Sequence, residues 1–574
     1  MSSRLLLSLA AVAVAFAAAD TYVVVLALPE MMTGVGLGAD ELQRAAPIVS
    51  GFLLGYVAVL PLTGRIADLR GRLPVLVGSL VVFAFGSLVT AAAYDLPSMV
   101  AGRFLQGVGG GGLVPATLAL VADLYPPSRR GVPLGVVGAV QEVGSVLGPL
   151  YGALVLAVSQ WQAIFAVNLA VGLVLAAALR AAGPRPALPG RPDVAGGLLA
   201  ASALMALVLT MVQPTFLATA VTAGLVFVPV AGDSRWLAPM GIAVVVLAVA
   251  FLGRCLTVRR PVVDVRRWAA VARRADLLGA TLLGLALAGV ILAFATAEPE
   301  VSLLSPLGPW LLLASAGFVV LLWRHARHAA DPLVPRGALA ARPAWGALTV
   351  SFFVGAALIA ALVDIPLFAR VTVHPDSQLD AALMLVRLLV ALPVGALAGG
   401  YLTGRVPVGV VAALGMVLAA AGLGWMSTWT LTSLASPVAS VPLVLTGLGF
   451  GLALAPVNAA LLAATGDHVH GVTSALLVVA RMVGMLVGIS ALTTIGLRRY
   501  YAVQTDLPAP SEVCSSSTQC SAYTRLLREA GLAQLETVFL GAAVCALVAG
   551  VLALVLFRSE TVIRTRQKSG TVPP

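Results

Sequence analysis

Two carboxylates stand inside long apolar segments of this chain. Asp20 lies in FAAADTYVVVLALPE (16–30) and Glu142 lies in GAVQEVGSVLGPL (138–150). Removal from water favours the protonated acid, whereas a nearby cation favours the carboxylate, so a carboxylate balanced between these effects can bind and release protons near neutral pH. Arg481, in VVARMVGMLVG (478–488), is a cation in the same kind of setting. Asp20, Glu142 and Arg481 are therefore the candidate proton-coupling residues.

Each of these residues also has a purely structural interpretation. Asp20 could be the fixed partner of a buried arginine. Glu142 stands in a glycine-rich segment, where a helix–helix contact is as reasonable as a proton relay. Arg481 is a charge partner under either interpretation. Asp364 and Arg387 lie in consecutive apolar segments, which favours a static ion pair over a proton pathway.

The chain contains no motif for ATP hydrolysis or for nucleophilic catalysis. His468 and His470 in TGDHVHG are too few ligands to hold a metal ion. We therefore expect no enzymatic activity, no metal and no cofactor, with a proton gradient as the energy source. Cys514 and Cys520 in CSSSTQC are expected outside the cell membrane, where a disulfide is favoured over two free thiols.

The composition is that of a membrane protein. Hydrophobic residues make up 60% of the 574 residues, charged residues make up 10%, and the mean hydropathy is +1.02. Apolar segments of about 20 residues, long enough to cross a bilayer as a helix, recur along the chain. We predict an all-α protein with many spans. The net charge of +11 then belongs to one membrane face and is no sign of nucleic-acid binding.

Sixteen spans are predicted, in groups of six, four and six. They cover residues 5–33, 44–63, 74–94, 98–124, 131–158, 162–182, 194–213, 237–257, 276–297, 309–324, 344–370, 380–403, 408–428, 441–464, 472–503 and 521–557. Arginine-rich loops alternate with arginine-poor loops, which predicts an inner-membrane protein with both termini in the cytoplasm. Residues 215–230 must then form an outside loop or a re-entrant piece, since one more span would invert everything downstream.

A cleaved signal peptide is the alternative for the first segment. The small residues before Asp20 resemble a cleavage site, but the apolar segment continues past Asp20 to Met32 and is a full span. Counting 1.5 Å per residue, Asp20, Glu142 and Arg481 lie about 23, 16 and 14 Å from the cytoplasmic ends of their helices, near the middle of the membrane. The same count places Arg103, Asp364 and Arg387 about 8–11 Å from the outer ends, or deeper for Asp364.

Internal repeats divide the chain. LTGR occurs at 62–65 and 402–405, GVGGGGLVPATLAL (107–120) resembles GLGFGLALAPVNAALL (447–462), and QEVGSVLG (141–148) resembles RMVGMLVG (481–488). These repeats predict two pseudo-symmetric six-helix bundles, residues 1–182 and 343–574. Between them, residues 183–342 carry two transmembrane hairpins, and the second bundle ends in an extended outer hairpin and a basic cytoplasmic tail.

Three motifs resemble those of the major facilitator superfamily of secondary transporters. GRIADLRGRL (64–73) is similar to the family's loop between helices 2 and 3, although Leu69 and Leu73 replace basic residues. GRFLQGVGGGG (102–112) resembles the fourth-helix motif, and GSVLGPLYG (144–152) resembles the fifth-helix motif of proton-driven exporters. The matching residues are Gly64, Asp68, Gly71 and Arg72; Arg103 and Gln106; and Gly144, Gly148, Pro149 and Gly152.

The resemblance implies roles for these residues. Asp68 would pair with Arg72 or with a helix N-terminus and latch one conformation. The glycines and Pro149 would bend the fifth helix and pack it closely. The extra central helices are similar to the drug:proton antiporter branch. Over 1–182 and 343–557, but not 193–258, the chain more closely resembles the mycobacterial triacylglyceride exporters, which work with a periplasmic lipid-binding lipoprotein.

We therefore expect a monomeric, proton-coupled exporter that moves an apolar or lipid substrate by alternating access. Its partners would be membrane lipids, the substrate and a periplasmic lipid-carrier lipoprotein. Two alternatives stay open at this point, namely a multidrug:proton antiporter and a membrane scaffold that transports nothing.

Overall fold

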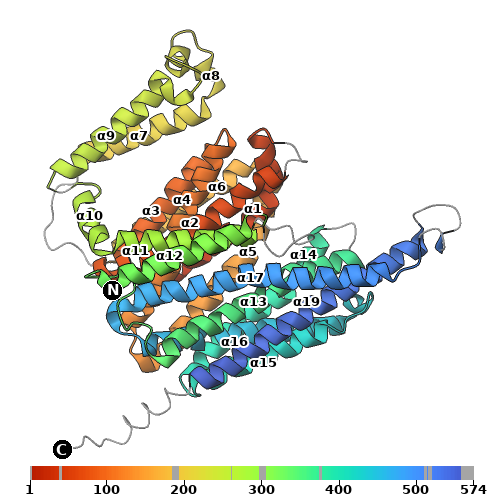
Figure 1. The fold of residues 1–574 in the computed structure, drawn as a ribbon. Coiled ribbons are helices and arrows are strands. Elements are labelled where there is room, and N and C mark those ends of the chain that lie inside the picture. Colours follow the sequence, from red (N-terminus) through yellow and green to blue (C-terminus); the bar gives the residue numbers. More distant parts are fainter. Residues whose placement is uncertain are drawn as a thin grey trace, which may run out of the picture.

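The computed structural model describes residues 3–37, 42–183, 193–259, 261–295, 305–373, 378–509, 513–514 and 520–557. Throughout these ranges the regular elements are helices, and no strand occurs (Figure 1). Sixteen of the helices are long and apolar enough to cross a membrane. The predicted fold class, an all-α protein with about sixteen spans, is confirmed.

The first bundle, drawn in red to orange in Figure 1, contains six helices. They are α1 (Ser3–Gly34), α2 (Leu42–Arg70), α3 (Arg72–Ala91), α4 (Leu96–Leu124), α5 (Gly131–Val158) and α6 (Trp161–Ala182). Asp95 starts α4 with a capping box, in which its carboxylate accepts the N–H of Ser98 and the Ser98 hydroxyl accepts the N–H of Asp95. Gly71 separates α2 from α3 with φ at +97°, a conformation that favours glycine.

The second bundle repeats this plan. Its helices are α13 (Arg342–Thr372), α14 (Gln378–Thr403), α15 (Val408–Met426), α16 (Ser440–Ala464), α17 (His470–Thr505) and α19 (Ser521–Leu556). Among its closely packed pairs are α14 with α16, α15 with α16, α13 with α17 and α15 with α19. They correspond one for one to α2 with α4, α3 with α4, α1 with α5 and α3 with α6. The internal sequence repeats therefore correspond to repeated packing.

Two hairpins occupy the centre of the chain. The first joins α7 (Val194–Val212) to α9 (Pro239–Thr257), and α10 (Val265–Arg274) leads to the second, α11 (Leu277–Ala295) with α12 (Gly308–His328). The α7–α9 hairpin stands beside the first bundle (Figure 1), which it touches where Met211 packs on Val89 and Ala92 and where Arg235 lies over the ring of Tyr94. By contrast, α11 packs against α2 and α17, one helix from each bundle.

The segment between α7 and α9 does not cross the membrane. It contains one short helix, α8 (Thr215–Ala218), and two 3-10 turns, at Gly224–Phe227 and Arg235–Leu237. Its apolar side chains are largely exposed, with Val221 at 91%. The two hairpin helices therefore run antiparallel, and the loop lies at the end of the hairpin that we predicted to be outside.

The molecule has two distinct ends, which we name the basic face and the opposite face. The basic face carries the start of α1, the last turn of α2 with Arg70, the turn with Arg129 and Arg130, and α10 with its four arginines. The opposite face carries the 215–230 segment and the outer ends of α17 and α19, which project beyond the other helices (Figure 1).

This arrangement predicts that Asp233 and Arg267, both exposed, lie on opposite sides of the membrane. A cysteine placed at either position, in a protein whose Cys255 and Cys545 are serine, is treated with a membrane-impermeant maleimide on intact cells. We expect labelling at position 233 only, and labelling at 267 only after permeabilisation. Labelling of both positions on intact cells would contradict the sixteen-span topology.

Candidate functional site

Asp20 is buried in the middle of α1 and is held by side chains of α4 and α6. It is 1% exposed, and Arg103 Nη1 donates to its Oδ2 at 2.8 Å. Asn168 Nδ2 donates to Oδ1, and Gln106 Nε2 lies 3.5 Å from the same oxygen. One cation therefore neutralises the carboxylate, and both of its oxygens are partnered.

Arg103 and Gln106, the two residues of the fourth-helix motif, belong to this same network. Arg103 donates to Gln106 Oε1 at 2.8 Å, and its guanidinium lies 4.5 Å from the ring centre of Phe52. Gln106 Nε2 donates in turn to Ser87 Oγ at 2.8 Å. The desolvation of two buried charges largely offsets their attraction, so the pair is a weak source of stability and points to function.

The depth count wrongly separated Asp20 from Arg103. Gly110 of α4 lies beside Ala17 of α1. Arg103 lies seven residues from Gly110, and Asp20 lies three residues from Ala17, in each case towards the opposite face. The backbones of Asp20 and Arg103 therefore differ by about 6 Å in their height along the bundle. An arginine side chain bridges this gap. The depth count failed because the two helices end at different heights and because the count does not include the length of the side chains.

Asn168 was not predicted as a member of the site. It is 1% exposed in α6, and its amide provides one of the contacts to Asp20. The available signal was an amide within the apolar segment IFAVNLAVGLV (164–174), because a polar side chain at that depth requires a partner. Phe52 carried no such signal, since an aromatic residue in a span is ordinary.

The exporter-motif glycines press α5 onto α1 beside Asp20. They face α1 at one-turn spacing and are Gly144, Gly148 and Gly152. A Cβ atom at Gly148 would lie 2.4 Å from the carbonyl oxygen of Ala19, the neighbour of Asp20. The close packing that the motif implied is therefore present. Pro149 lies within α5, but its side chain falls outside the described residues.

Glu142 and Arg481 line a cavity between the two bundles, away from Asp20. Glu142 projects from α5 of the first bundle and Arg481 from α17 of the second, and their charges attract across the interface. No direct ion pair joins these two described residues. The structure thus divides the three candidate proton-coupling residues into two sites.

The cavity is small and mainly apolar in this conformation. Its volume is about 30 Å³, which suffices for about two water molecules. Besides the two charged residues, Gln141, Ser351 and Asn458 contribute polar groups, and the remaining lining residues are Ala, Gly, Leu and Val. In this conformation the cavity itself is too small to hold a large substrate.

Asp68 joins the two bundles at the basic face. Its carboxylate accepts the backbone N–H groups of Gly471 at 2.8 Å and Val472 at 3.0 Å, in the first turn of α17, and it also pairs with Arg72. The positive end of the α17 dipole favours a carboxylate at this point. Gly64 lets the backbones touch, since its Cβ would lie 2.4 Å from the carbonyl oxygen of Gly471.

Arginines complete this junction. Arg72 Nη2 donates to the carbonyl oxygen of Asp467 at 3.2 Å, and its Nε lies 3.3 Å from a carboxylate oxygen of Asp123. Arg130, next to α5, lies 3.8 Å from the Asp467 carboxylate. Burial lowers the pKa of Arg130, and the carboxylates of Asp467 and Asp123 counteract this effect. Asp68 therefore engages both partners that the sequence offered as alternatives, Arg72 and a helix N-terminus.

A second inter-bundle contact lies at the same face. A Cβ at Gly131 of α5 would lie 2.4 Å from the carbonyl oxygen of Gly400 in α14, and one at Gly135 would lie 2.6 Å from that of Ala396. From these contacts the two bundles diverge towards the opposite face (Figure 1). The structure is therefore closed at its basic face.

Asp364 and Arg387 do not form the predicted ion pair. Arg387 Nη1 instead donates to Ser440 Oγ at 3.0 Å, and Asp364 is 3% exposed. The two residues lie in neighbouring helices at similar depth, but depth does not determine which way a side chain points around its helix.

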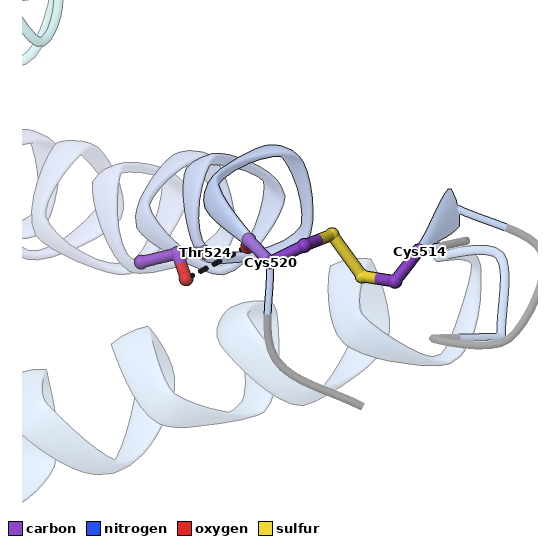
Figure 2. Close-up of a disulfide and its surroundings, with 3 residues drawn as sticks. All are labelled: Cys514, Cys520 and Thr524. Atoms are coloured by element: carbon purple, nitrogen blue, oxygen red, sulfur yellow. Dashed lines mark hydrogen bonds between the residues drawn. A yellow bond between two sulfur atoms is a disulfide. The ribbon is translucent and has the colours of Figure 1, made fainter. Parts of the chain in front are cut away.

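The predicted disulfide between Cys514 and Cys520 is present, with their Cα atoms 5.8 Å apart (Figure 2). It lies between the outer ends of α17 and α19, which have 36 residues each. Such a helix is about 54 Å long, whereas the hydrocarbon core is about 30 Å thick. Both helices therefore extend beyond the membrane at the opposite face. At their base lies a groove of about 400 Å³, lined by Leu367 and Val371 of α13 and by residues of α17 and α19.

Loosening the Asp68 junction should open the basic face. Each hydrogen bond to a charged group contributes about 1.5–3 kcal/mol, so Asp68→Asn should raise the open population about tenfold or more. Gly64→Ala should act similarly through its clash with Gly471. The measurement is the rate at which a maleimide added from the basic side labels a cysteine at cavity residue Asn458.

The matched control is Gly424→Ala, because a Cβ there has no atom within 4 Å. We expect this control to label at the parental rate. Unchanged labelling in both Asp68→Asn and Gly64→Ala would contradict the assignment of a latch.

Comparison with known proteins agrees with this geometry. The Major Facilitator Superfamily model matches residues 10–320. The triacylglyceride transporter of Mycolicibacterium smegmatis is 33% identical over 97% of this chain and 88% of its own length. That of Mycobacterium tuberculosis is 34% identical over 88% of this chain and 85% of its own length.

Solved structures share the fold. The proton:xylose symporter XylE superposes with a TM-score of 0.52 at 13% identity, covering 95% of this chain and 94% of that chain. The human organic anion transporter MFSD10 superposes with a TM-score of 0.52 at 14% sequence identity, covering 96% of this chain and 100% of that chain. The resemblance predicted from the motifs is confirmed, and it favours transport over the scaffold alternative. The chain belongs to the major facilitator superfamily, and it is a multi-pass membrane transporter and not an enzyme.

Proposed function

We propose that this transporter uses the proton gradient to export an apolar lipid, of the triacylglyceride class, from the inner membrane. The observation that carries the proposal is the buried Asp20–Arg103 pair, a carboxylate that is 1% exposed inside a transporter bundle. The proton gradient makes a further cofactor unnecessary, and each charge that crosses the membrane contributes about 2.3 kcal/mol per 100 mV.

The proposed orientation places the basic face, and with it both termini, in the cytoplasm. Arginine-rich loops remain on the cytoplasmic side of inner-membrane proteins. The disulfide-bonded hairpin tip then lies outside, in an oxidising compartment. The present conformation, closed at the basic face, corresponds to the outward-directed half of an alternating-access cycle.

In this mechanism a proton competes with Arg103 for Asp20. Protonation of Asp20 removes the charge that holds Arg103, and the guanidinium retains Gln106 and the Phe52 ring as partners. Because α5 rests directly on α1 at Gly148 and Ala19, a shift of α1 is transmitted to α5. The same α5 carries Glu142 into the cavity. Proton binding at Asp20 can thus alter the interface between the bundles.

Glu142 and Arg481 are proposed to couple that change to the cavity. Their opposite charges attract across the interface, so a neutral Glu142 would weaken the attraction. The alternative role, a helix–helix contact within the first bundle, receives less support because Glu142 lines the cavity between the bundles. Arg481 is the charge partner in either case.

The lipid cargo is supported by two observations. The cavity is lined mostly by Ala, Gly, Leu and Val, and the relatives from two mycobacterial species are named triacylglyceride transporters. The protein would act as a monomer and pass its cargo to a periplasmic lipid-carrier lipoprotein. The extended α17–α19 hairpin, with the groove at its base, would guide the lipid out of the leaflet. Multidrug efflux is the alternative that the tests below separate.

Asp20→Asn should abolish proton-driven export, because an amide cannot bind and release the proton. Purified protein in proteoliposomes with an imposed pH gradient is assayed with a fluorescent triacylglyceride. The variant should still exchange the lipid down its own concentration gradient, which shows that it is folded. Gradient-driven export at the parental rate would remove Asp20 from the proton pathway.

Deleting residues 503–524, which shortens both helices of the hairpin and removes the segment that joins them, should impair lipid export more than efflux of a small cationic dye. A dye can leave directly into water, whereas a lipid needs an apolar path beyond the leaflet. The control is the Cys514→Ser, Cys520→Ser variant, which keeps the helices and removes only their clip. Equal loss of the two activities, or loss of neither, would count against a lipid guide.

A further inference from the structure

Asp364 is a buried carboxylate for which the described part of the chain provides no partner. It stands in α13, is 3% exposed, and makes no hydrogen bond or ion pair with the described residues. This distinguishes it from Asp20, which has Arg103, and from Asp68, which has Arg72 and two backbone N–H groups. Within the described part of the chain, therefore, no cation forms an ion pair with the Asp364 carboxylate.

Four helices pack on α13, and none of their described side chains forms an ion pair with Asp364. They are α14, α16, α17 and α19. Gly488 of α17 packs on Ala356, so Asp364 is level with Gly496, which contacts α19 at Gln534 and Val538. Arg481 lies 15 residues nearer the basic face than Gly496, which is about 22 Å along the axis of α17.

Arg498 and Arg499 of α17 lie two and three residues beyond Gly496, and both are exposed. Glu536 of α19 interacts electrostatically with Arg499 of α17, and Arg387 of α14 donates to Ser440. No charged side chain occurs in α16. An ionised Asp364 would thus stand alone in an apolar interior, which is strongly unfavourable, whereas the neutral acid is compatible with it.

An aromatic cluster covers Asp364 towards the opposite face. Phe368, one turn further along α13, packs on Trp429 at 5.1 Å and on Phe539 at 6.3 Å between ring centres. Trp429 and Phe539 are 6.2 Å apart, and all three rings are buried. Trp429 belongs to the connection between α15 and α16, at the opposite face. The cluster therefore separates the carboxyl group from that face.

The internal repeat shows that Asp364 is not the counterpart of Asp20. Gly148 packs on Ala19 in the first bundle, and Gly488 packs on Ala356 in the second. The position equivalent to Asp20 is therefore Ala357, seven residues before Asp364. Asp364 lies about two helical turns nearer the opposite face. It is a separate feature of the second bundle.

We propose that Asp364 is a second proton-binding site, occupied by a proton in this conformation, which exchanges that proton with the outer solution when the Phe368–Trp429–Phe539 cluster separates. This role deepens the proposed proton coupling and rests on it for its purpose in transport. Proton binding at Asp364 itself can be measured without any transport assay.

The first test uses dicyclohexylcarbodiimide, which reacts with a protonated carboxyl group. The acid adds across one C=N bond, and the adduct rearranges to an N-acylurea, so the whole reagent is retained and nothing leaves. Full-length protein in lipid nanodiscs is treated at neutral pH and digested for mass spectrometry. We expect the reagent on Asp364, with labelling unchanged in Asp20→Asn and lost in Asp364→Asn. Exposed Asp331 is the internal control and should stay unlabelled.

The second test uses infrared spectroscopy of the same sample in heavy water. A protonated carboxyl group gives a carbonyl band that should disappear in Asp364→Asn and persist in Asp20→Asn. Trp429→Ala should speed hydrogen–deuterium exchange of this band several-fold, because it opens the cluster. Absence of both the label and the band would contradict proton binding at Asp364. An exchange rate unchanged by Trp429→Ala would contradict the role of the aromatic cluster in closing the site. Neither result depends on whether Asp20 drives export.

Discussion

An ionised side chain inside a bilayer must find its counter-charge within the protein, and this constraint organises the chemistry of the molecule. Asp20 is neutralised by Arg103 of another helix. Asp68 is neutralised by Arg72 and by the first turn of α17. Each contact therefore ties the position of a helix to the ionisation of one group. A proton that enters either contact changes how the helices are held.

Close contact between helix backbones transmits such changes from one helix to the next. Glycines at one-turn spacing bring α5 against α1, and Gly64 brings α2 against the start of α17. Packed interiors of this kind move as units between discrete arrangements because there is little space to absorb a small shift. The two bundles are thus stiff bodies joined at the basic face, and the buried charges lie where α1 meets α4 and α6 and where the bundles face each other.

Hydropathy and arginine distribution were sufficient to predict the sixteen spans, because the bilayer selects long apolar helices. Motif residues such as Asp68 and Arg103 were also recognised. The partners of the buried charges were predicted less well. The count of depth along each helix predicted that Asp20 and Arg103 lie apart and that Asp364 and Arg387 form an ion pair. Both predictions were wrong. A single sequence gives height along a helix, but the direction around the helix axis and the reach of the side chain depend on tertiary packing.

The central claim is that protonation of Asp20 alters the contact between the bundles, and double electron–electron resonance tests it directly. Spin labels at Leu69 of α2 and Val410 of α15, both exposed at the basic face, report the distance between the bundles in nanodiscs. In the parental protein we predict that the distance distribution shifts as the pH falls. Asp20→Asn should hold the low-pH distribution at every pH. An identical pH response in the parental protein and in Asp20→Asn would contradict the account.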